Sequence, residues 1–214
     1  MARIALINPN TSTGTTEMMV AVARAAAPGD VSVEGLTAAF GAPLIVEPEA
    51  LAVAGDAVVA LAGELRDFDA VIVAAFGDPG RDRLADLVDV PVVGIAEAAM
   101  AAACAVAERF AVVTTTPGLA MSIRAVAAGY GHEAALVGVL TPEGDAARLM
   151  ADPDAVARVL EDLAREAREE LGAGAVVVGG GPLAATARAL AGRLPIPVIE
   201  PVPAAVALAV HRLN

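Results

Sequence analysis

Short apolar runs alternate with stretches of helical periodicity along the whole chain. Apolar runs that fit strands lie at 3–7, 31–36, 70–75, 90–95, 110–113, 135–140, 175–178 and 196–199. The periodicity between them predicts helices over 15–26, 49–65, 81–88, 97–107, after Pro117 to about 128, and over 153–171, 183–194 and 203–213. Continuous apolar strands that alternate with helices are typical of parallel sheets covered on both faces. The pattern therefore predicts an α/β fold.

The second half of the chain repeats the design of the first half. The strand and polar loop at 3–12 match those at 110–117, 69–73 matches 174–178, and 90–93 matches 196–199. The repeat predicts two pseudo-symmetric βα halves, 3–107 and 108–214, each with a mostly parallel sheet. The last helix of the first half is a candidate to cross over to the second. Two halves of this kind would meet along a ligand cleft.

Ligands of open parallel sheets bind beyond the carboxyl ends of the strands. Here that edge carries four loops: 8–10, 75–77, 114–116 and 179–181. The hydroxyl-rich loops 11–13 and 114–116 each lie between a strand and a helix start. Their side chains either cap the helix or, with free amides, hold a small anion. The glycines at 179–181 either supply a turn with positive φ or bring the backbone close to a ligand.

Composition and charge narrow the class of partner. The net charge is −12, which disfavours nucleic acid and anionic membranes, and aromatic residues are only 2 % of the chain. No apolar run approaches the length of a membrane helix. We expect a cytoplasmic protein. With one cysteine, Cys104, an internal disulfide is impossible, and the two histidines lack metal-ligand spacing, so we expect no metal site.

Four motifs, in order along the chain, resemble the hydantoin racemase branch of the aspartate/glutamate racemase superfamily. They are Ile7–Ser12, Phe76–Gly80, Val92–Ala98 and Phe110–Thr115. The resemblance implies a cofactor-independent enzyme with two pseudo-symmetric α/β halves, usually a homo-oligomer. It would act on a small carboxylate or cyclic amide, at the carbon next to a carbonyl. In the family, two cysteines, one from each half, serve as acid and base on opposite faces of that carbon.

This sequence departs from the family pattern at both cysteines. Ala75 stands where the family has a cysteine before the Phe-Gly-Asp-Pro-Gly turn, and Gly180 stands in place of the cysteine of the Gly-Cys-Ala-Gly segment. Neither residue can transfer a proton, so two-thiol racemisation is not possible here. Cys104 lies mid-helix in an alanine-rich stretch, where we expect it to pack as a small apolar residue.

Three carboxylates near the strand ends are the remaining candidates for proton transfer. Asp78 would either act as a general base or cap the helix near Arg81. Glu97 would either act as a general acid or base or cap its own helix. Glu200 would either take part in proton transfer or be a solvated loop residue. The residues predicted to bind substrate are Asn10, Thr11, Ser12, Pro43, Phe76, Gly77, Thr114, Thr115, Thr116, Gly181 and Pro182.

Three further segments have weaker interpretations. The loop with Glu47, Pro48 and Glu49 is a candidate to close the cleft, and the break that holds Tyr130 and His132 fits a surface turn. Two functions remain open at this point. One is an enzyme with diverged, non-thiol isomerase, lyase or cyclase chemistry. The other is a catalytically inactive protein that binds or senses a small anion. The position of the three carboxylates relative to Ala75 and Gly180 separates them.

Overall fold

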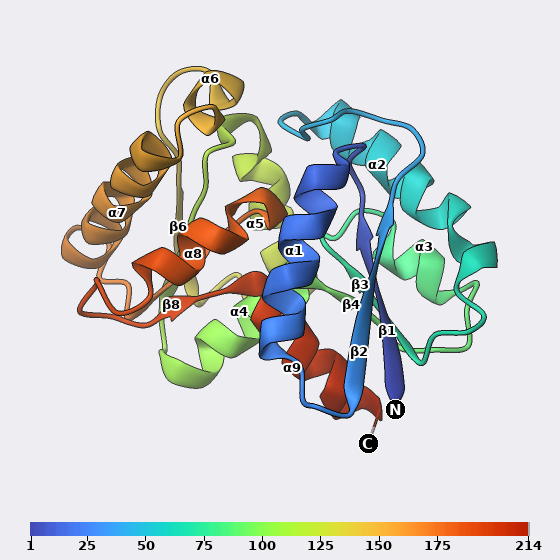
Figure 1. The fold of residues 1–214 in the computed structure, drawn as a ribbon. Coiled ribbons are helices and arrows are strands. Elements are labelled where there is room, and N and C mark those ends of the chain that lie inside the picture. Colours follow the sequence, from blue (N-terminus) through green and yellow to red (C-terminus); the bar gives the residue numbers. More distant parts are fainter. Residues whose placement is uncertain (214) are drawn as a thin grey trace.

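The computed structural model describes residues 1–213, which fold into two four-stranded parallel sheets surrounded by helices (Figure 1). The first sheet has the order β2-β1-β3-β4 and the second β6-β5-β7-β8, so the topology repeats as the sequence predicts. The strands are β1 Ala2–Asn8, β2 Val31–Thr37, β3 Ala70–Val73, β4 Val92–Gly94, β5 Phe110–Val113, β6 Leu136–Leu140, β7 Ala175–Val178 and β8 Val198–Ile199. The predicted α/β class is confirmed.

The helices follow the predicted segments with two differences. They are α1 Thr13–Ala26, α2 Pro48–Ala60, α3 Arg81–Ala85, α4 Ile95–Val106, α5 Ala120–Gly129, α6 Ala146–Met150, α7 Pro153–Glu169, α8 Ala184–Leu190 and α9 Pro201–Leu213. Three short 3₁₀ helices are also present: η1 Ala62–Glu64, η2 Pro117–Leu119 and η3 Gly181–Leu183. The short helix α6 was not predicted, and the segment 49–65 is divided into α2 and η1. Side-chain oxygens of Ser12 and Asp152 cap α1 and α7.

The central strands of both sheets lie in the hydrophobic core. Every residue of β3, β5 and β7 is buried, as continuous apolar runs require when helices cover both faces of a sheet. One hydrophobic cluster joins residues from both halves, including Ile72 of β3, Phe110 of β5 and Val177 of β7. The two sheets therefore share a core. Within residues 1–213, no helix is both long and apolar enough to cross a bilayer.

The last helices of the two halves lie at the junction between the sheets. Helix α4 contacts β7 and β8 of the second sheet, and α9 packs on α4, α1 and the strands β3 and β4 of the first sheet. In Figure 1, α9 lies below α1, beside β2, although it ends the chain. Each half thus sends its final helix against the other. This arrangement fixes the distance between the carboxyl ends of the two sheets.

Candidate active site

A cavity lies between the halves, at the carboxyl ends of the central strands. It contains about 550 Å³ of space, part of it open to solvent. Its lining comes from loops and helices of both halves: Asn10, Leu44, Ile45, Leu51, Ala74, Ala75, Phe76, Thr114, Thr115, Thr116, Leu119, Ile123, Met150, Gly179, Gly180, Gly181, Pro182 and Leu183. Ala75 and Gly180, which the resemblance places where the family has thiols, are therefore both wall residues of one cavity.

The structure brings most of the residues predicted to bind substrate to this cavity, but not all. Asn10, Phe76, the three threonines 114–116, Gly181 and Pro182 line it. Thr11, Ser12, Pro43 and Gly77 do not. Ser12 accepts a hydrogen bond from the Thr15 amide as the cap of α1, and the Thr11 amide donates to the Ala42 carbonyl. The hydroxyl-rich loop 11–13 therefore serves helix α1 and the neighbouring loop.

The polar part of the lining consists of hydrogen-bond donors and hydroxyls. The side-chain oxygen of Asn10 accepts from Asn8 Nδ2 at 2.8 Å and from the Ser12 amide at 2.9 Å, which orients the carboxamide. Several donors of the lining have no protein hydrogen-bond partner among residues 1–213. They are the NH₂ group of Asn10 and the backbone amides of Ala75, Phe76, Thr115, Thr116 and Gly180. Unpaired amides that follow strand ends favour ligands with carboxylate or carbonyl oxygens.

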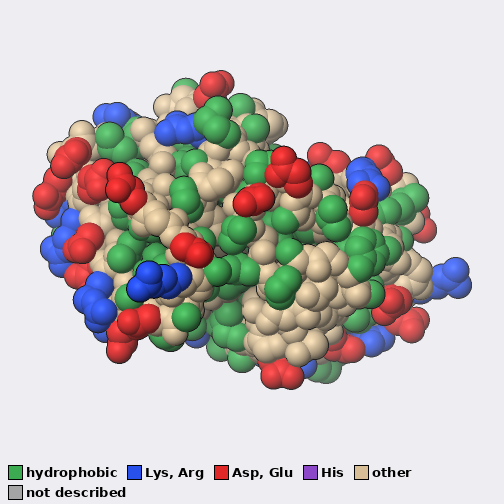
Figure 2. All heavy atoms as spheres, turned by 90° about the horizontal axis from the view of Figure 1, so that it is seen from above, with side chains coloured by type: hydrophobic (Ala, Val, Ile, Leu, Met, Phe, Trp, Pro, Cys, Tyr) green, Lys and Arg blue, Asp and Glu red, His purple; other side chains and the backbone are tan. Residues whose placement is uncertain are grey.

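No titratable side chain is among the described residues that line the cavity. They are aliphatic or aromatic residues, glycine, proline, threonine, methionine and one asparagine. Figure 2, a view onto the upper end of the molecule, shows acidic, basic and hydrophobic side chains interspersed over this face. An anion would therefore be recognised by local donors. The cavity itself supplies no group that takes up or gives a proton near neutral pH.

Asp78 is buried outside the lining, and its carboxylate accepts three hydrogen bonds. One oxygen accepts from the Ala96 amide at 2.8 Å, and the other accepts from the Glu97 amide and from the Tyr130 hydroxyl, both at 2.8 Å. Burial raises the pKa of Asp78 to about 6, against the lowering effect of these hydrogen bonds. Asp78 therefore caps α4. The interpretation of Asp78 as a cap for the helix near Arg81 is wrong, because α3 begins after Gly80 without a side-chain cap.

The backbone around Asp78 is shaped to admit its carboxylate. Asp78 is the only non-glycine residue with positive φ within residues 1–213, at 49°. A Cβ atom on Gly94 would lie 2.0 Å from the Asp78 carboxyl carbon, so a side chain at 94 would displace it. The turn after β3 and the start of α4 are therefore fitted to each other, and this turn carries the cavity wall residue Phe76.

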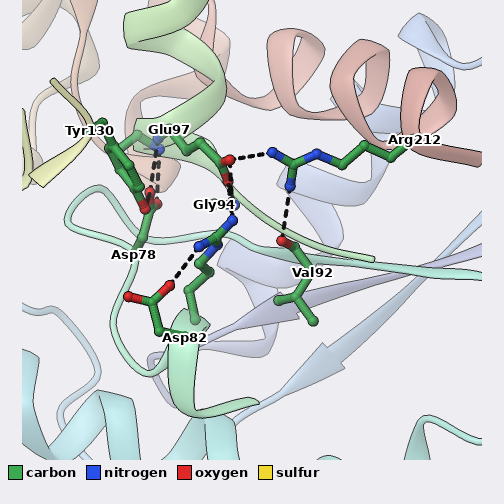
Figure 3. Close-up of polar contacts among 9 residues, drawn as sticks. Asp78, Asp82, Val92, Gly94, Glu97, Tyr130 and Arg212 are labelled. Carbon is green, nitrogen blue, oxygen red and sulfur yellow. Dashed lines mark hydrogen bonds and ion pairs between the residues drawn. The ribbon is translucent and has the colours of Figure 1, made fainter. Parts of the chain in front are cut away.

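Glu97 and Glu200 are held in ion pairs. Glu97 bonds to the Arg212 guanidinium and lies 3.1 Å from Arg81, and it also accepts a hydrogen bond from the amide of Gly94, the residue before α4 (Figure 3). Arg212 donates a second bond to the Val92 carbonyl at 3.2 Å. Glu200 lies 3.1 Å from the side chain of Arg188. Neither carboxylate lines the cavity.

Tyr130 lies in the turn after α5, as expected, but its side chain is not on the open surface. It is half-buried, and burial together with the nearby charge of Asp78 raises the pKa of its hydroxyl, so it acts as a donor. Figure 3 shows its ring reaching toward Asp78 from the end of α5. His132 lies close by, with its Nδ1 3.4 Å from the sulfur of Cys104. Cys104 is half-buried against the core, and burial raises the pKa of its thiol.

Sequence reasoning missed part of the apolar lining. Leu44 and Ile45 come from the loop after β2, and Met150 comes from α6, after β6. These segments follow the edge strands of the two halves, so they occupy equivalent places in the repeat. That equivalence is the signal in the sequence from which these lining residues could have been found. It was hidden because the two loops share no motif and only one of them forms a helix.

The glycine turn after β7 makes close contacts with the first half. A Cβ atom on Gly181 would lie 2.5 Å from the Ala74 carbonyl oxygen and 2.6 Å from the sulfur of Met19. Gly180 has φ 139°, a conformation that other residues rarely adopt. The turn therefore needs positive φ, and it brings backbone close to the opposite wall; its approach to a ligand stays a prediction.

Two repeated parallel sheets with a cavity between their carboxyl ends define a two-half α/β protein. The chain matches the Asp/Glu/Hydantoin racemase family over residues 4–209. It belongs to this family of isomerase-type enzymes.

Relatives with known names support the same placement. The hydantoin racemase of Paenarthrobacter aurescens is 33% identical over 207 residues, which is 95% of this chain and 87% of that protein. The structure of allantoin racemase from Klebsiella pneumoniae matches with a TM-score of 0.92 at 34% identity, over 99% of this chain and 87% of that chain. Allantoin racemase from Pseudomonas fluorescens gives a TM-score of 0.93 at 31% identity, over 98% of this chain and 89% of that chain.

Proposed function

We propose that this protein binds a small carboxylate or cyclic amide in the cavity between Ala75 and Gly180 and does not exchange a proton with it. The observation that carries the proposal is the composition of the lining, which combines unpaired donors with an absence of titratable side chains. A racemase needs an acid and a base on opposite faces of the reacting carbon. Here the two family cysteine positions present only the methyl group of Ala75 and the backbone of Gly180.

The ligand class follows from the donors and from the relatives. Hydantoin and allantoin, which the names of the relatives contain, are cyclic amides whose carbonyl oxygens accept hydrogen bonds. The amides of Ala75, Phe76, Thr115, Thr116 and Gly180 offer donors from both halves to such oxygens, or to a carboxylate. Recognition needs neither a metal nor a cofactor.

The three candidate carboxylates give no support to proton transfer. The carboxylate oxygens of Asp78 accept hydrogen bonds from the first amides of α4 and from Tyr130, while Glu97 and Glu200 are paired with arginines. A base must lie within hydrogen-bond reach of the proton that it removes. Because none of the three lines the cavity, the binding function is favoured over acid–base catalysis by these groups.

Calorimetric titration tests the proposal with a matched pair of variants. The ligands are 5-substituted hydantoins and 2-substituted carboxylates. Thr115→Val removes a buried hydroxyl from the lining, and Thr13→Val removes an exposed one at the start of α1. We expect Thr115→Val to weaken binding about 2- to 13-fold, the range for one hydrogen bond, and Thr13→Val to leave it unchanged. Absence of binding across the panel, or equal effects of both variants, would contradict the proposal.

A second candidate is a lyase that needs only electrostatic stabilisation. The same unpaired amides could stabilise an enolate formed when a ligand loses CO₂, with solvent water returning the proton to carbon. The donors on both walls favour this possibility over isomerisation, which needs a base. Incubation with 2-substituted malonates, followed by NMR detection of the monocarboxylate product, distinguishes the lyase from the binding protein.

A further inference from the structure

The loop that follows β2 spans the cavity from one half to the other. We name residues 38–47 the strap; it leaves the upper end of β2 toward the second half before α2 begins (Figure 1). Its first residue is held by a bond from the Ala38 amide to the Asn8 carbonyl at 2.9 Å. Further along, the Ala42 carbonyl accepts from the Thr11 amide at 3.2 Å. The strap is thus anchored to the first half at its start and middle.

The far end of the strap contacts the opposite half at a glycine. Gly118 lies in η2, at the start of the segment that leads into α5. A Cβ atom on Gly118 would lie 2.6 Å from the carbonyl oxygen of Val46 and 3.8 Å from the Cα of Glu47. These are backbone atoms, so a side chain at position 118 would displace the strap. Gly118 has no left-handed φ, so the contact accounts for the glycine.

Docking of the strap completes the cavity wall. Ile45, next to Val46, is only 9% exposed, and both Ile45 and Leu44 line the cavity. If the strap moved away from Gly118, these two side chains would leave the lining, and the cavity would open toward solvent. The wall and the contact between the halves therefore depend on the same few residues.

We propose that the strap is a latch that closes the ligand cavity by docking on Gly118 of the opposite half, and that Gly118 sets how firmly it closes. A bound ligand is then enclosed by Leu44 and Ile45 and escapes only when the latch opens. The consequence for ligand exchange rests on the proposed binding function, whereas the docking itself does not.

Gly118→Ala tests the latch, with Gly129→Ala as its control. Gly129 ends α5, has no left-handed φ, and a Cβ there meets nothing within 4 Å. Hydrogen exchange is measured on peptides that cover 8–12 and 38–47. We expect the Thr11 amide, which bonds to the strap, to exchange about tenfold faster or more in Gly118→Ala, and at the wild-type rate in Gly129→Ala. Equal exchange in all three proteins would overturn the latch.

A second variant covers the case in which Gly118→Ala does not fold. Ile45→Ala leaves the glycine contact in place but removes the apolar anchor of the strap, so exchange of the Thr11 amide should also rise. If neither folded variant changes it, the latch is wrong. Ligand kinetics separate the two proposals: exchange that responds to Gly118→Ala while no hydantoin or carboxylate binds would support the latch and refute the binding function. Binding with unresponsive exchange would do the reverse.

Discussion

The Tyr130 hydroxyl donates a 2.8 Å hydrogen bond to the carboxylate of Asp78, 52 residues earlier in the chain. Tyr130 follows α5 in the second half, and Asp78 lies in the turn after β3 in the first. The same carboxylate accepts from the amides of Ala96 and Glu97 at the start of α4. One buried group therefore ties together the turn beside the cavity, the crossing helix and the second half.

Tyr130→Phe should destabilise the protein by about 1.5–3 kcal/mol at pH 8, the usual contribution of a hydrogen bond to a charged group. The phenyl ring is retained, so packing changes little. Urea unfolding measures the change. The same substitution made in an Asp78→Asn background is the control, and it should cost clearly less. Equal costs in the two backgrounds would show that the bond contributes nothing specific.

Asp78 should make the free energy of unfolding depend on pH between about 4 and 6. Its pKa rises from 3.8 to about 6 on folding because of burial. The folded protein therefore holds this proton at pH values where the unfolded chain has lost it. The stabilisation is complete below pH 4 and is lost as pH rises through 6, by roughly 3 kcal/mol for a shift of about two units.

Asp78→Asn isolates this effect, because it removes the charge and keeps the size of the side chain. The difference in unfolding free energy between wild type and Asp78→Asn should turn against wild type from pH 4 to 6 and stay constant above about pH 7. A difference that is flat from pH 4 to 8, or that changes in the opposite direction, would show that burial does not raise the pKa of Asp78.

The two positions that lack family thiols should differ in their tolerance of a side chain. Ala75 has no left-handed backbone, whereas Gly180 has φ 139° with Leu183 Cδ1 3.3 Å from a Cβ placed there. Ala75→Cys should remain about as stable as wild type, while Gly180→Ala and Gly180→Cys should each lose about 1–3 kcal/mol. Thermal unfolding measures this, with Gly129→Ala as control. An unaffected Gly180→Cys protein would mean that the turn relaxes freely.

Glu97 should contribute more to stability than an ion-paired glutamate that is less deeply buried. Its side chain is 13% exposed and contacts both Arg81 and Arg212. Glu97→Gln should cost about 1–3 kcal/mol because two part-buried guanidinium groups lose their charged partner. Glu161, which pairs with Arg165 one helical turn away, is the control, and Glu161→Gln should have little effect. Similar losses in both variants would contradict a special role for Glu97.

The fold could be predicted from the sequence because its signals are local. The apolar runs of β3, β5 and β7 are continuous, and the repeat of the loops after β1 and β5 implied two equivalent sheets. Helix α6 is a five-residue helix between the strand predicted at 135–140 and the helix predicted from 153, and the sequence analysis predicted no element there. The packing of α9 across the first sheet depends on long-range contacts that no local pattern records.

The candidate site was predictable only in part. Loops at strand ends were identified because parallel strands deliver their carboxyl ends to one edge. The roles of the carboxylates were not, because a cap such as Asp78 on α4 joins residues that are distant in sequence, and its choice between α3 and α4 depends on the backbone turn. The apolar wall from Leu44, Ile45 and Met150 likewise comes from a loop and a short helix whose positions only the tertiary structure fixes.

The central claim is that the cavity binds a ligand without transferring a proton. Proton NMR in deuterated water tests both parts in one sample of wild-type protein with a 5-substituted hydantoin or a 2-substituted carboxylate. We predict saturation transfer from protein to ligand, reporting binding, and an α-proton signal that stays at the intensity of the protein-free sample. Loss of the α-proton signal at a rate that scales with protein concentration would contradict the account, because it would require an acid or base that the cavity lining does not contain.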